Sequence, residues 1–276
     1  MRIFFAGAAP RHFRTFEELD VKNILMSYAS PASAETVASW LGKRPGGVFL
    51  LDSGAFSVWR SGKTIDLNAY IDFSKDFIAR YRGRIKVHIV NLDVIPGVQG
   101  IPPTKAEIDE AAERGWNNML QMEKAGITPL HIFHQGEDFR WLEKLSARHR
   151  YIGISPSNDM TTKSKHAWLR HVYSIIRAKN MTHGFGVTAK SLMQAFPWYS
   201  VDSTSWLAPE IYGKAVFSTG LDDFGLKGGE SGLSSRKKSH VARVTFTNIR
   251  EVLRLQRVYT NLWAHRGVVW PEDEII

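Results

Sequence analysis

Short apolar segments alternate with longer segments of helical periodicity, and this alternation limits the folds open to the chain. Eight apolar runs predict β-strands, at residues 2–7, 23–29, 47–54, 86–93, 129–136, 151–155, 184–187 and 198–203. Helical spacing of apolar residues predicts helices over 67–81, 104–126, 138–149, 165–180 and 189–196. Strands separated mostly by helices are typical of parallel sheets. The sequence therefore predicts an α/β fold, a (β/α)8 TIM barrel, with a doubly wound open sheet as the alternative.

The helix predicted over 104–126 carries its own start and stop signals. Thr104 with Glu107 three residues later is a capping-box pattern. In this pattern the side chain of each residue accepts a hydrogen bond from the backbone N–H of the other. Gly126 is typical of a helix C-terminus, where the left-handed conformation is needed.

The pattern changes after Trp206, so two regions are expected. Residues 1–210 form the catalytic barrel, and 211–276 form a basic loop and a C-terminal helix packed on it. Within the second region, 225–240 is a glycine- and serine-rich loop that leads into a basic cluster, and 247–267 has helical periodicity. No run of about 18 apolar residues exists, so no membrane-spanning segment is expected, and the opening residues are interpreted as a first strand.

The composition restricts the chemistry and the partners. The chain has no cysteine, which excludes disulfides and cysteine-built metal sites and fits a reducing cytoplasm. A net charge of +9 attracts polyanions, and nucleic acid is the first candidate; a merely basic soluble protein is the alternative.

Much of the positive charge lies in the last quarter of the chain. Arg250, Arg254 and Arg257 are spaced by four and three residues, which places them on one helix face. The expected nucleic-acid-binding residues are Arg236, Lys237, Lys238, Arg243, Arg250, Arg254 and Arg257. A solvated surface face is the alternative interpretation. No alternating acids are expected to neutralise these residues.

Several predicted strands end in polar side chains. These are Asp52, Asp93, His134 with Gln135, Ser155 to Ser157, and Asp202. A single such acid could cap the following helix, but the loops after the strands of a barrel converge on one rim, so a shared site is expected there. Converging carboxylates suit glycoside chemistry, and a glutamine suits recognition of a base edge. Binding of a divalent metal is the competing use of these acids, and no metal site is expected.

Aromatic and histidine residues near these strand ends have two interpretations. Phe56, Trp198 and Trp206 could stack on bases or exclude water, but single aromatics of this kind are more often core residues. His131 and His134 are expected on one face of a strand in packing and hydrogen-bonding roles, with His134 at the pocket edge.

Three segments carry a resemblance to a known family. "LLDSGAFSVW", "HIFHQGEDFRWL" and "HGFGVTAKSLMQAFPWYSVDSTSWL" resemble, in order and spacing, motifs of the tRNA-guanine transglycosylase superfamily. The resemblance covers about residues 45 to 207. With "NLDVIPG", "YIGISPSND" and "VDSTSW", the chain looks closest to the bacteriophage and bacterial DNA-guanine transglycosylases, which exchange guanine in DNA for a 7-deazaguanine.

The resemblance implies a role for each matching residue. Asp202 is implied as the nucleophile that forms a covalent glycosyl intermediate, and Asp52 as the general acid and base. The implied substrate-binding residues are Ser53, Gly54, Phe56, Asp93, Gln135, Gly136, Gly153, Ile154 and Gly186. The implied partners are double-stranded DNA and a free 7-deazaguanine base, with 7-cyano-7-deazaguanine expected, and no cofactor is implied.

Departures from the family leave alternatives open. The structural zinc site of the tRNA enzymes needs cysteines that this chain lacks, and Ala55 and Ser57 replace a glycine and a glutamine of the motif, which leaves the base specificity open. Base exchange in tRNA, a catalytically inactive nucleic-acid-binding barrel and a small-molecule lyase or hydrolase are the alternatives. The oligomeric state is not readable from the sequence.

Overall fold

The structure is a computed structural model of the chain. It describes residues 1–98, 100–157, 160–177, 179–187, 189–212, 214–215, 222–223 and 235–271.

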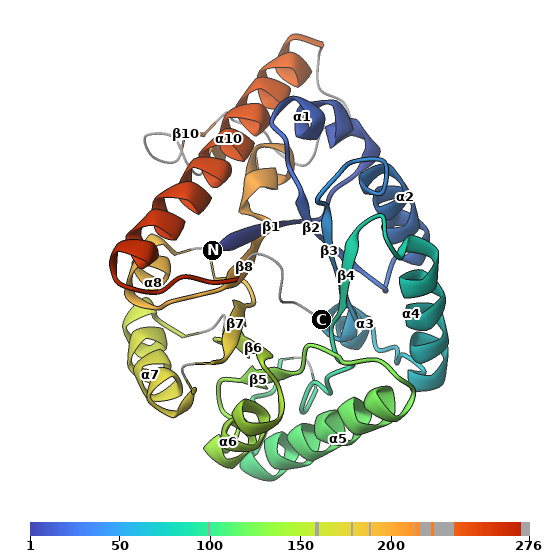
Figure 1. Cartoon of the computed structure of the whole chain (residues 1–276), viewed down its shortest axis with the longest axis vertical. Coiled ribbons are helices and arrows are strands. Elements are labelled where there is room, and N and C mark those ends of the chain that lie inside the picture. The colour runs from blue at the N-terminus through green and yellow to red at the C-terminus, as the bar shows by residue number, and fades with distance from the viewer. Residues whose placement is uncertain are drawn as a thin grey trace.

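Eight parallel strands form one curled sheet at the centre of the molecule, with helices around it (Figure 1). The strands are β1 (Arg2–Ala6), β2 (Asn23–Ser27), β3 (Val48–Asp52), β4 (Lys86–Ile89), β5 (Ile132–His134), β6 (Tyr151–Ser155), β7 (Met181–Gly184) and β8 (Ser200–Ser203). Their order in the sheet is β4-β3-β2-β1-β8-β7-β6-β5, and a parallel bridge between Val90 and Leu130 joins the ends of β4 and β5. Neighbours in the sheet are neighbours in the chain, apart from the first and last strands, which differs from the reversed order of a doubly wound sheet. The α/β fold is confirmed, and the arrangement is consistent with a TIM-like barrel.

The helices follow the strands and cover the outside of the sheet. They are α1 (Phe13–Glu18), α2 (Pro31–Leu41), α3 (Ala55–Arg60), α4 (Leu67–Tyr81), α5 (Lys105–Lys124), α6 (Phe139–Arg148), α7 (Thr162–Ile175), α8 (Lys190–Ala195), α9 (Ala208–Tyr212) and α10 (Ser235–His265), with 3-10 turns η1 (Pro10–His12) and η2 (Ser205–Leu207). A short antiparallel pair joins β9 (Lys214–Ala215) to β10 (Asp222–Asp223). Helix α4 spans the predicted residues. The capping box of α5 is confirmed, because Thr104 N donates to Glu107 Oε2 at 2.7 Å and Glu107 N donates to Thr104 Oγ1 at 3.3 Å.

Several predicted boundaries are wrong. The strand expected at 184–187 is β7 at Met181–Gly184, because Gly186 has a φ of +63° and ends the extended run, while buried Thr182 and His183 belong to the strand despite their polarity. The strands expected over 86–93 and 129–136 are shorter, and the helix expected over 165–180 is α7, which begins and ends earlier.

The C-terminal helix begins at Ser235 rather than 247, and its earlier turns bury Val241 and Thr245. The loop predicted over 225–240 is therefore wrong for 235–240, and 225–234 lie outside the described residues.

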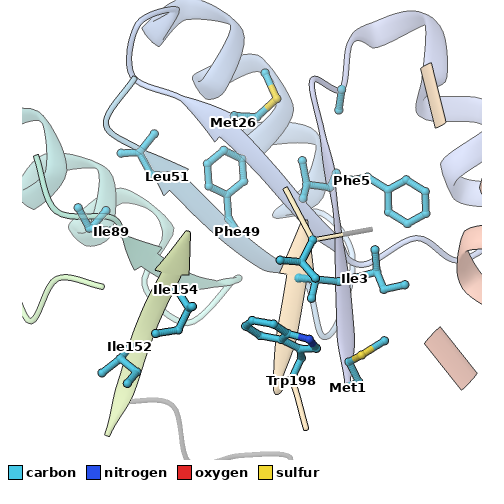
Figure 2. Packing of buried hydrophobic residues seen from close by; sticks show 14 of the residues in the cluster. Met1, Ile3, Phe5, Met26, Phe49, Leu51, Ile89, Ile152, Ile154 and Trp198 are labelled. Atoms are coloured by element: carbon cyan, nitrogen blue, oxygen red, sulfur yellow. The ribbon is translucent and has the colours of Figure 1, made fainter. Parts of the chain in front are cut away.

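The core has two parts, because side chains of a strand alternate between the two faces of the sheet. Figure 2 shows the outer part, in which Ile3, Phe5, Phe49, Leu51 and other residues pack between the sheet and the helices. The inner part fills the curled sheet, and it consists of Phe4, Ala6, Leu25, Val48, Leu50, Val90, Leu130 and Ile132. The alternation therefore assigns Asp52, which follows Leu50 by two residues, to the inner face.

Helix α10 packs along β1 in the opposite direction to the strands. Near its C-terminal end the Met1 ammonium donates to Thr260 Oγ1 at 2.9 Å, and Ile3 N donates to Gln256 Oε1 at 2.8 Å. Near its N-terminal end Thr245 Oγ1 lies 3.5 Å from Glu210 Oε1. The division of the chain at residue 210 stays a prediction. Among the described helices, none has the length and apolar character needed to cross a membrane.

Candidate active site

Carboxylates from three strands meet at the C-terminal ends of the strands. Asp52 ends β3, Asp93 follows β4, and Asp202 lies in β8. Burial and, next, the charge of Asp93 raise the pKa of Asp52 to about 7, with a smaller contribution from the charge of Asp202 and against backbone hydrogen bonds from Gly54 and Ser53. Asp52 and Asp202 are separated in the strand order by β2 and β1. The structure thus places the two predicted catalytic acids at the same end of the curled sheet.

The turn after β3 holds Asp52 in place. Gly54 N donates to Asp52 Oδ2 at 2.9 Å. Gly54 has a φ of +79°, and a Cβ there would lie 2.4 Å from Ser27 Oγ and 2.7 Å from Ala29 Cβ. The position thus accepts only glycine without distortion. Ser53 is fully buried, so it shapes the floor of the site rather than its surface.

Asp93 is held from two sides. Ser53 Oγ donates to its Oδ1 at 3.3 Å, and His134 Nε2 lies 3.1 Å from its Oδ2. Burial lowers the pKa of His134, but the hydrogen bond with Asp93 and the charge of Glu137 outweigh burial and raise it. Burial also raises the pKa of Glu137 to about 7, opposed by the charge of His134. Asp93, His134 and Glu137 thus form a second set of interacting charged groups in the site. The sequence interpretation included Asp93 and His134 but not Glu137.

His134 at the end of β5 and His131 directly before the strand point to opposite faces of the sheet. His134 lines the pocket described below, as predicted. His131 instead has its Nδ1 2.9 Å from Asn91 Nδ2, and its ring contacts Trp116 of α5. The expectation that both lie on one face is wrong, because residues three apart in an extended chain point to opposite faces.

Asp202 is held by the segment after β7. Gly186 N donates to its Oδ1 at 2.8 Å, and His183 Nε2 lies 3.4 Å from the same oxygen. The Asp202 side chain is 14% exposed, so it is partly accessible. Among the described residues, the recorded contacts of Asp202 involve Oδ1 and leave Oδ2 without a hydrogen bond.

A pocket of about 420 Å³ opens beside these carboxylates. Asp52, Asp93, Gln135 and Phe56 line it, and Phe56 is 53% exposed. The other lining residues are Ala55, Val94, Ile95, Pro96, Pro103, Ile108, Ala111, Ile132, His134, Glu137, Ser155, Pro156, Ser157 and Phe185. Asp202 is not among them, so the residue predicted as the nucleophile does not line the pocket.

Gln135 lines the pocket, and the oxygen of its side-chain amide already accepts a hydrogen bond. Its Oε1 accepts a hydrogen bond from Ser157 N at 3.0 Å, which leaves the amide NH₂ group to face a ligand. The following residue, Gly136, has a φ of +116° that permits the turn out of β5.

Of the nine predicted substrate-binding residues, three line the pocket and six do not: Ser53, Gly54, Gly136, Gly153, Ile154 and Gly186. Ile154 is fully buried in the core between the sheet and the helices, and its carbonyl accepts from Phe185 N at 3.0 Å. Gly153 N donates to His131 O at 2.8 Å, and a Cβ at Gly153 would lie 2.9 Å from Phe185. These backbone groups hold the sheet together, and Gly153 allows the Phe185 ring, which lines the pocket, to pack against β6.

The two tryptophans belong to the core. Trp198 and Trp206 are fully buried, and their Nε1 atoms donate to Leu192 O and Ala6 O at 3.1 and 3.0 Å. The favoured interpretation as core residues is therefore confirmed for both tryptophans, and it is wrong for Phe56, which is 53% exposed and available to a ligand.

The predicted basic residues are spread along α10. Arg243, Arg250, Arg254 and Arg257 are exposed, but Arg254 Nε donates to Glu251 Oε2 at 2.7 Å, so the expectation of a face without acids is wrong. Arg257 borders a second cavity together with Met1 and Arg2, at the N-terminal end of β1. It therefore lies at the opposite end of the strands from Asp52. The side chains of Arg236, Lys237 and Lys238 lie outside the described residues.

Within the part of the chain that the structure describes, no group of three or more histidine, aspartate or glutamate side chains is arranged to hold a metal ion. The arrangement instead offers one carboxyl group with a pKa near neutrality and a second, oriented carboxylate near it, a pair that suits proton transfer and nucleophilic attack. Comparison with models of protein families gives no match, and comparison with curated protein sequences gives none.

Proposed function

We propose that the chain is a base-exchanging transglycosylase that replaces guanine in DNA with a 7-deazaguanine, through a covalent intermediate on Asp202. The observation that carries the proposal is the placement of Asp52 and Asp202 at the C-terminal ends of strands β3 and β8 of one curled sheet, with Asp52 in the wall of the pocket. Burial, more than any charge, raises the pKa of Asp52 to about 7. Two interacting carboxyl groups, of which one readily holds a proton at neutral pH, meet the requirements of double displacement at a sugar carbon. The proposal takes the curled sheet as a (β/α)8 barrel with a basic C-terminal extension and without a zinc subdomain.

The first half-reaction breaks the bond between the sugar and guanine. The target nucleotide leaves the duplex stack to reach the site. Asp202 attacks C1′ with Oδ2 while Gly186 N holds Oδ1, and Asp52 in its protonated form donates to the departing guanine. The products are free guanine, ionised Asp52 and a glycosyl ester of Asp202.

The second half-reaction reverses these steps with a different base. Ionised Asp52 accepts the proton from N9 of the incoming 7-deazaguanine, and that nitrogen attacks C1′ and displaces Asp202. Two inversions at C1′ give net retention of configuration. Asp52 returns to its protonated form, so the cycle closes without a cofactor.

The pocket offers groups that match the polar edge of a guanine. Asp93 presents a carboxylate that Ser53 and His134 hold, and it can accept from N1–H and the 2-amino group. The free amide NH₂ of Gln135 can donate to O6 of the base, and the exposed ring of Phe56 can stack on it. Because 7-deazaguanines keep this polar edge, the same pocket serves both bases.

Contact with the DNA backbone is assigned to the N-terminal half of α10. This end of the helix lies toward the C-terminal ends of the strands, near Glu210 and η1. The net charge of +9 supports a polyanionic substrate. Arg257 lies at the far end and is not included in this contact.

Labelled guanine tests the proposal. The purified chain is expected to exchange radiolabelled guanine into double-stranded DNA, and Asp202→Ala is expected to abolish the exchange. Asp72→Ala, which removes an exposed acid on the outer helix α4, is the matched control and keeps the activity. Exchange into tRNA but not into DNA would favour the RNA alternative. DNA binding that Asp202→Ala leaves unchanged, without any exchange, would favour an inactive binding protein.

A further inference from the structure

A buried polar chain runs from Asp202 into the interior of the sheet. His183 of β7 is paired in register with Ser200 of β8, and both side chains are fully buried. His183 Nδ1 lies 2.8 Å from Ser200 Oγ, and Ser200 Oγ lies 2.6 Å from the hydroxyl oxygen of Tyr151. At the other side of the ring, His183 Nε2 lies 3.4 Å from Asp202 Oδ1. The Tyr151 hydroxyl also lies 3.4 Å from His183 Nδ1, so four side chains from three adjacent strands form one connected cluster.

Aromatic rings fix the plane of the imidazole. Phe185 packs against it edge-on with centroids 4.4 Å apart, and Phe4 does the same from 5.7 Å. The ring therefore has little freedom to turn Nε2 away from the carboxylate. Nε2 is buried, and at 3.4 Å it makes no hydrogen bond with good geometry in the ligand-free chain. A small movement of Asp202 on substrate binding would complete that bond.

For a neutral His183 beside an ionised Asp202, the donors and acceptors of this cluster allow one arrangement of hydrogen bonds. If His183 carries its proton on Nε2, then Nε2–H faces the carboxylate, Nδ1 accepts from the Ser200 hydroxyl, and Ser200 accepts from the Tyr151 hydroxyl. With the proton on Nδ1 instead, the lone pair of Nε2 would face an anionic oxygen, which is repulsive. Burial raises the pKa of Tyr151, so its hydroxyl keeps the proton that the first arrangement requires.

We propose that His183 is a positioning residue for the nucleophile, locked by Ser200 and Tyr151 in the tautomer that donates to Asp202 Oδ1 and so keeps Oδ2 free to bond to the sugar. This inference rests on the proposed function for its catalytic consequence, but the tautomer itself does not depend on it. The donor also stabilises the carboxylate that re-forms when the glycosyl ester breaks. His183 therefore assists the second half-reaction, in which Asp202 is the leaving group.

The first test measures the tautomer in the absence of DNA. Nitrogen-15 NMR of the imidazoles, with the His183 signal assigned by its loss in His183→Gln, is expected to show Nε2 protonated and Nδ1 bare. Ser200→Ala removes one oxygen and is expected to weaken this preference. Because the Tyr151 hydroxyl lies 3.4 Å from Nδ1, the double variant Ser200→Ala with Tyr151→Phe removes both donors. A proton on Nδ1 in the unsubstituted chain, or a tautomer ratio that the double variant leaves unchanged, overturns the proposal whether or not the chain exchanges bases.

The second test measures exchange kinetics. His183→Leu is expected to lower kcat by about 10- to 100-fold, the effect of losing a hydrogen bond to a charged group, with little change in the KM for DNA. The covalent intermediate is expected to accumulate, because its breakdown is slowed. His183→Gln keeps an amide donor and is expected to restore most of the rate.

The control is His149→Leu, which removes another buried histidine, one whose Nε2 lies 2.9 Å from Glu123 Oε1 and for which the described residues show no contact with His183, Ser200 or Asp202. Circular dichroism and thermal unfolding verify that each variant folds, and Ser200→Ala replaces His183→Leu in the kinetic test if the latter does not. An unchanged kcat in His183→Leu and in Ser200→Ala, or an equal loss in His149→Leu, overturns the proposal. Absence of exchange in the unsubstituted chain would instead remove the proposed function and leave the tautomer measurement to decide this inference.

Discussion

The carboxyl group of Asp52 should make the stability of the chain depend on pH in a defined direction. Its pKa is about 7 in the folded chain and 3.8 in the reference state, because burial and the charges of Asp93 and Asp202 oppose ionisation. Between these two values the folded chain holds a proton that the unfolded chain has released. Raising the pH through this range therefore lowers the stability, and the loss is complete above about pH 7.

The size of the effect follows from the two pKa values. At 1.36 kcal/mol per pH unit, the interval from 3.8 to about 7 corresponds to at most about 4 kcal/mol. Asp52→Asn removes the ionisation and keeps an oxygen that can accept the hydrogen bond from Gly54 N. The variant should thus match the unsubstituted chain near pH 4 and exceed its stability by up to about 4 kcal/mol at pH 8.

Urea unfolding at a series of pH values from 4 to 8 measures this difference. The free energy of unfolding of Asp52→Asn, minus that of the unsubstituted chain, should rise steadily to about pH 7 and then level. Asp72→Asn, at an exposed position on α4, should give a difference that does not vary with pH. A difference for Asp52→Asn that is flat across the series, or that falls as the pH rises, would refute the reasoning.

Three further predictions concern the site and the scaffold. Gly54→Ala should lower the free energy of unfolding by about 2 kcal/mol or more and reduce exchange, since the new Cβ meets Ser27 and Ala29 at a φ of +79°; thermal unfolding and the exchange assay measure both. Asp93→Asn removes a charge that raises the pKa of Asp52, so the pH above which the exchange rate declines should move down; a pH–rate profile with no shift would contradict this. Thr104→Ala removes the N-cap of α5 and should cost about 1 kcal/mol in urea unfolding without changing the exchange rate, whereas a change in rate would mean that α5 is coupled to the site.

The fold was largely readable from the sequence, because the relevant signals are local. Buried strands such as β3 are continuous apolar runs in the sequence. The capping-box pattern predicts the start of α5, and the structure forms that capping box. The helices α1, α2, α3 and α9 were not predicted, although α2 begins at Pro31, a residue typical of the first helical position. The start of α10 was missed because its first turns are rich in polar residues.

Part of the site could also be predicted from the sequence, because some of its residues lie at the ends of apolar runs. Asp52, Asp93 and Gln135 stand at the ends of apolar runs, so their position near one rim follows from the parallel arrangement of the strands. His183 was missed because the expected strand began one residue after it, and the inner or outer face of a side chain depends on register. The burial of Trp198 and Trp206 depends on contacts between distant segments, such as the bond from Trp206 Nε1 to Ala6 O, which a single sequence does not display.

The most direct measurement is the identification of the covalent intermediate. The chain is incubated with double-stranded DNA in the absence of a replacement base, denatured and digested, and the peptide that carries the sugar is identified by mass spectrometry. The account predicts a deoxyribosyl ester on Asp202, with none formed by Asp202→Ala and one still formed by Asp72→Ala. An adduct on another residue, or exchange that proceeds without any adduct on Asp202, would contradict it.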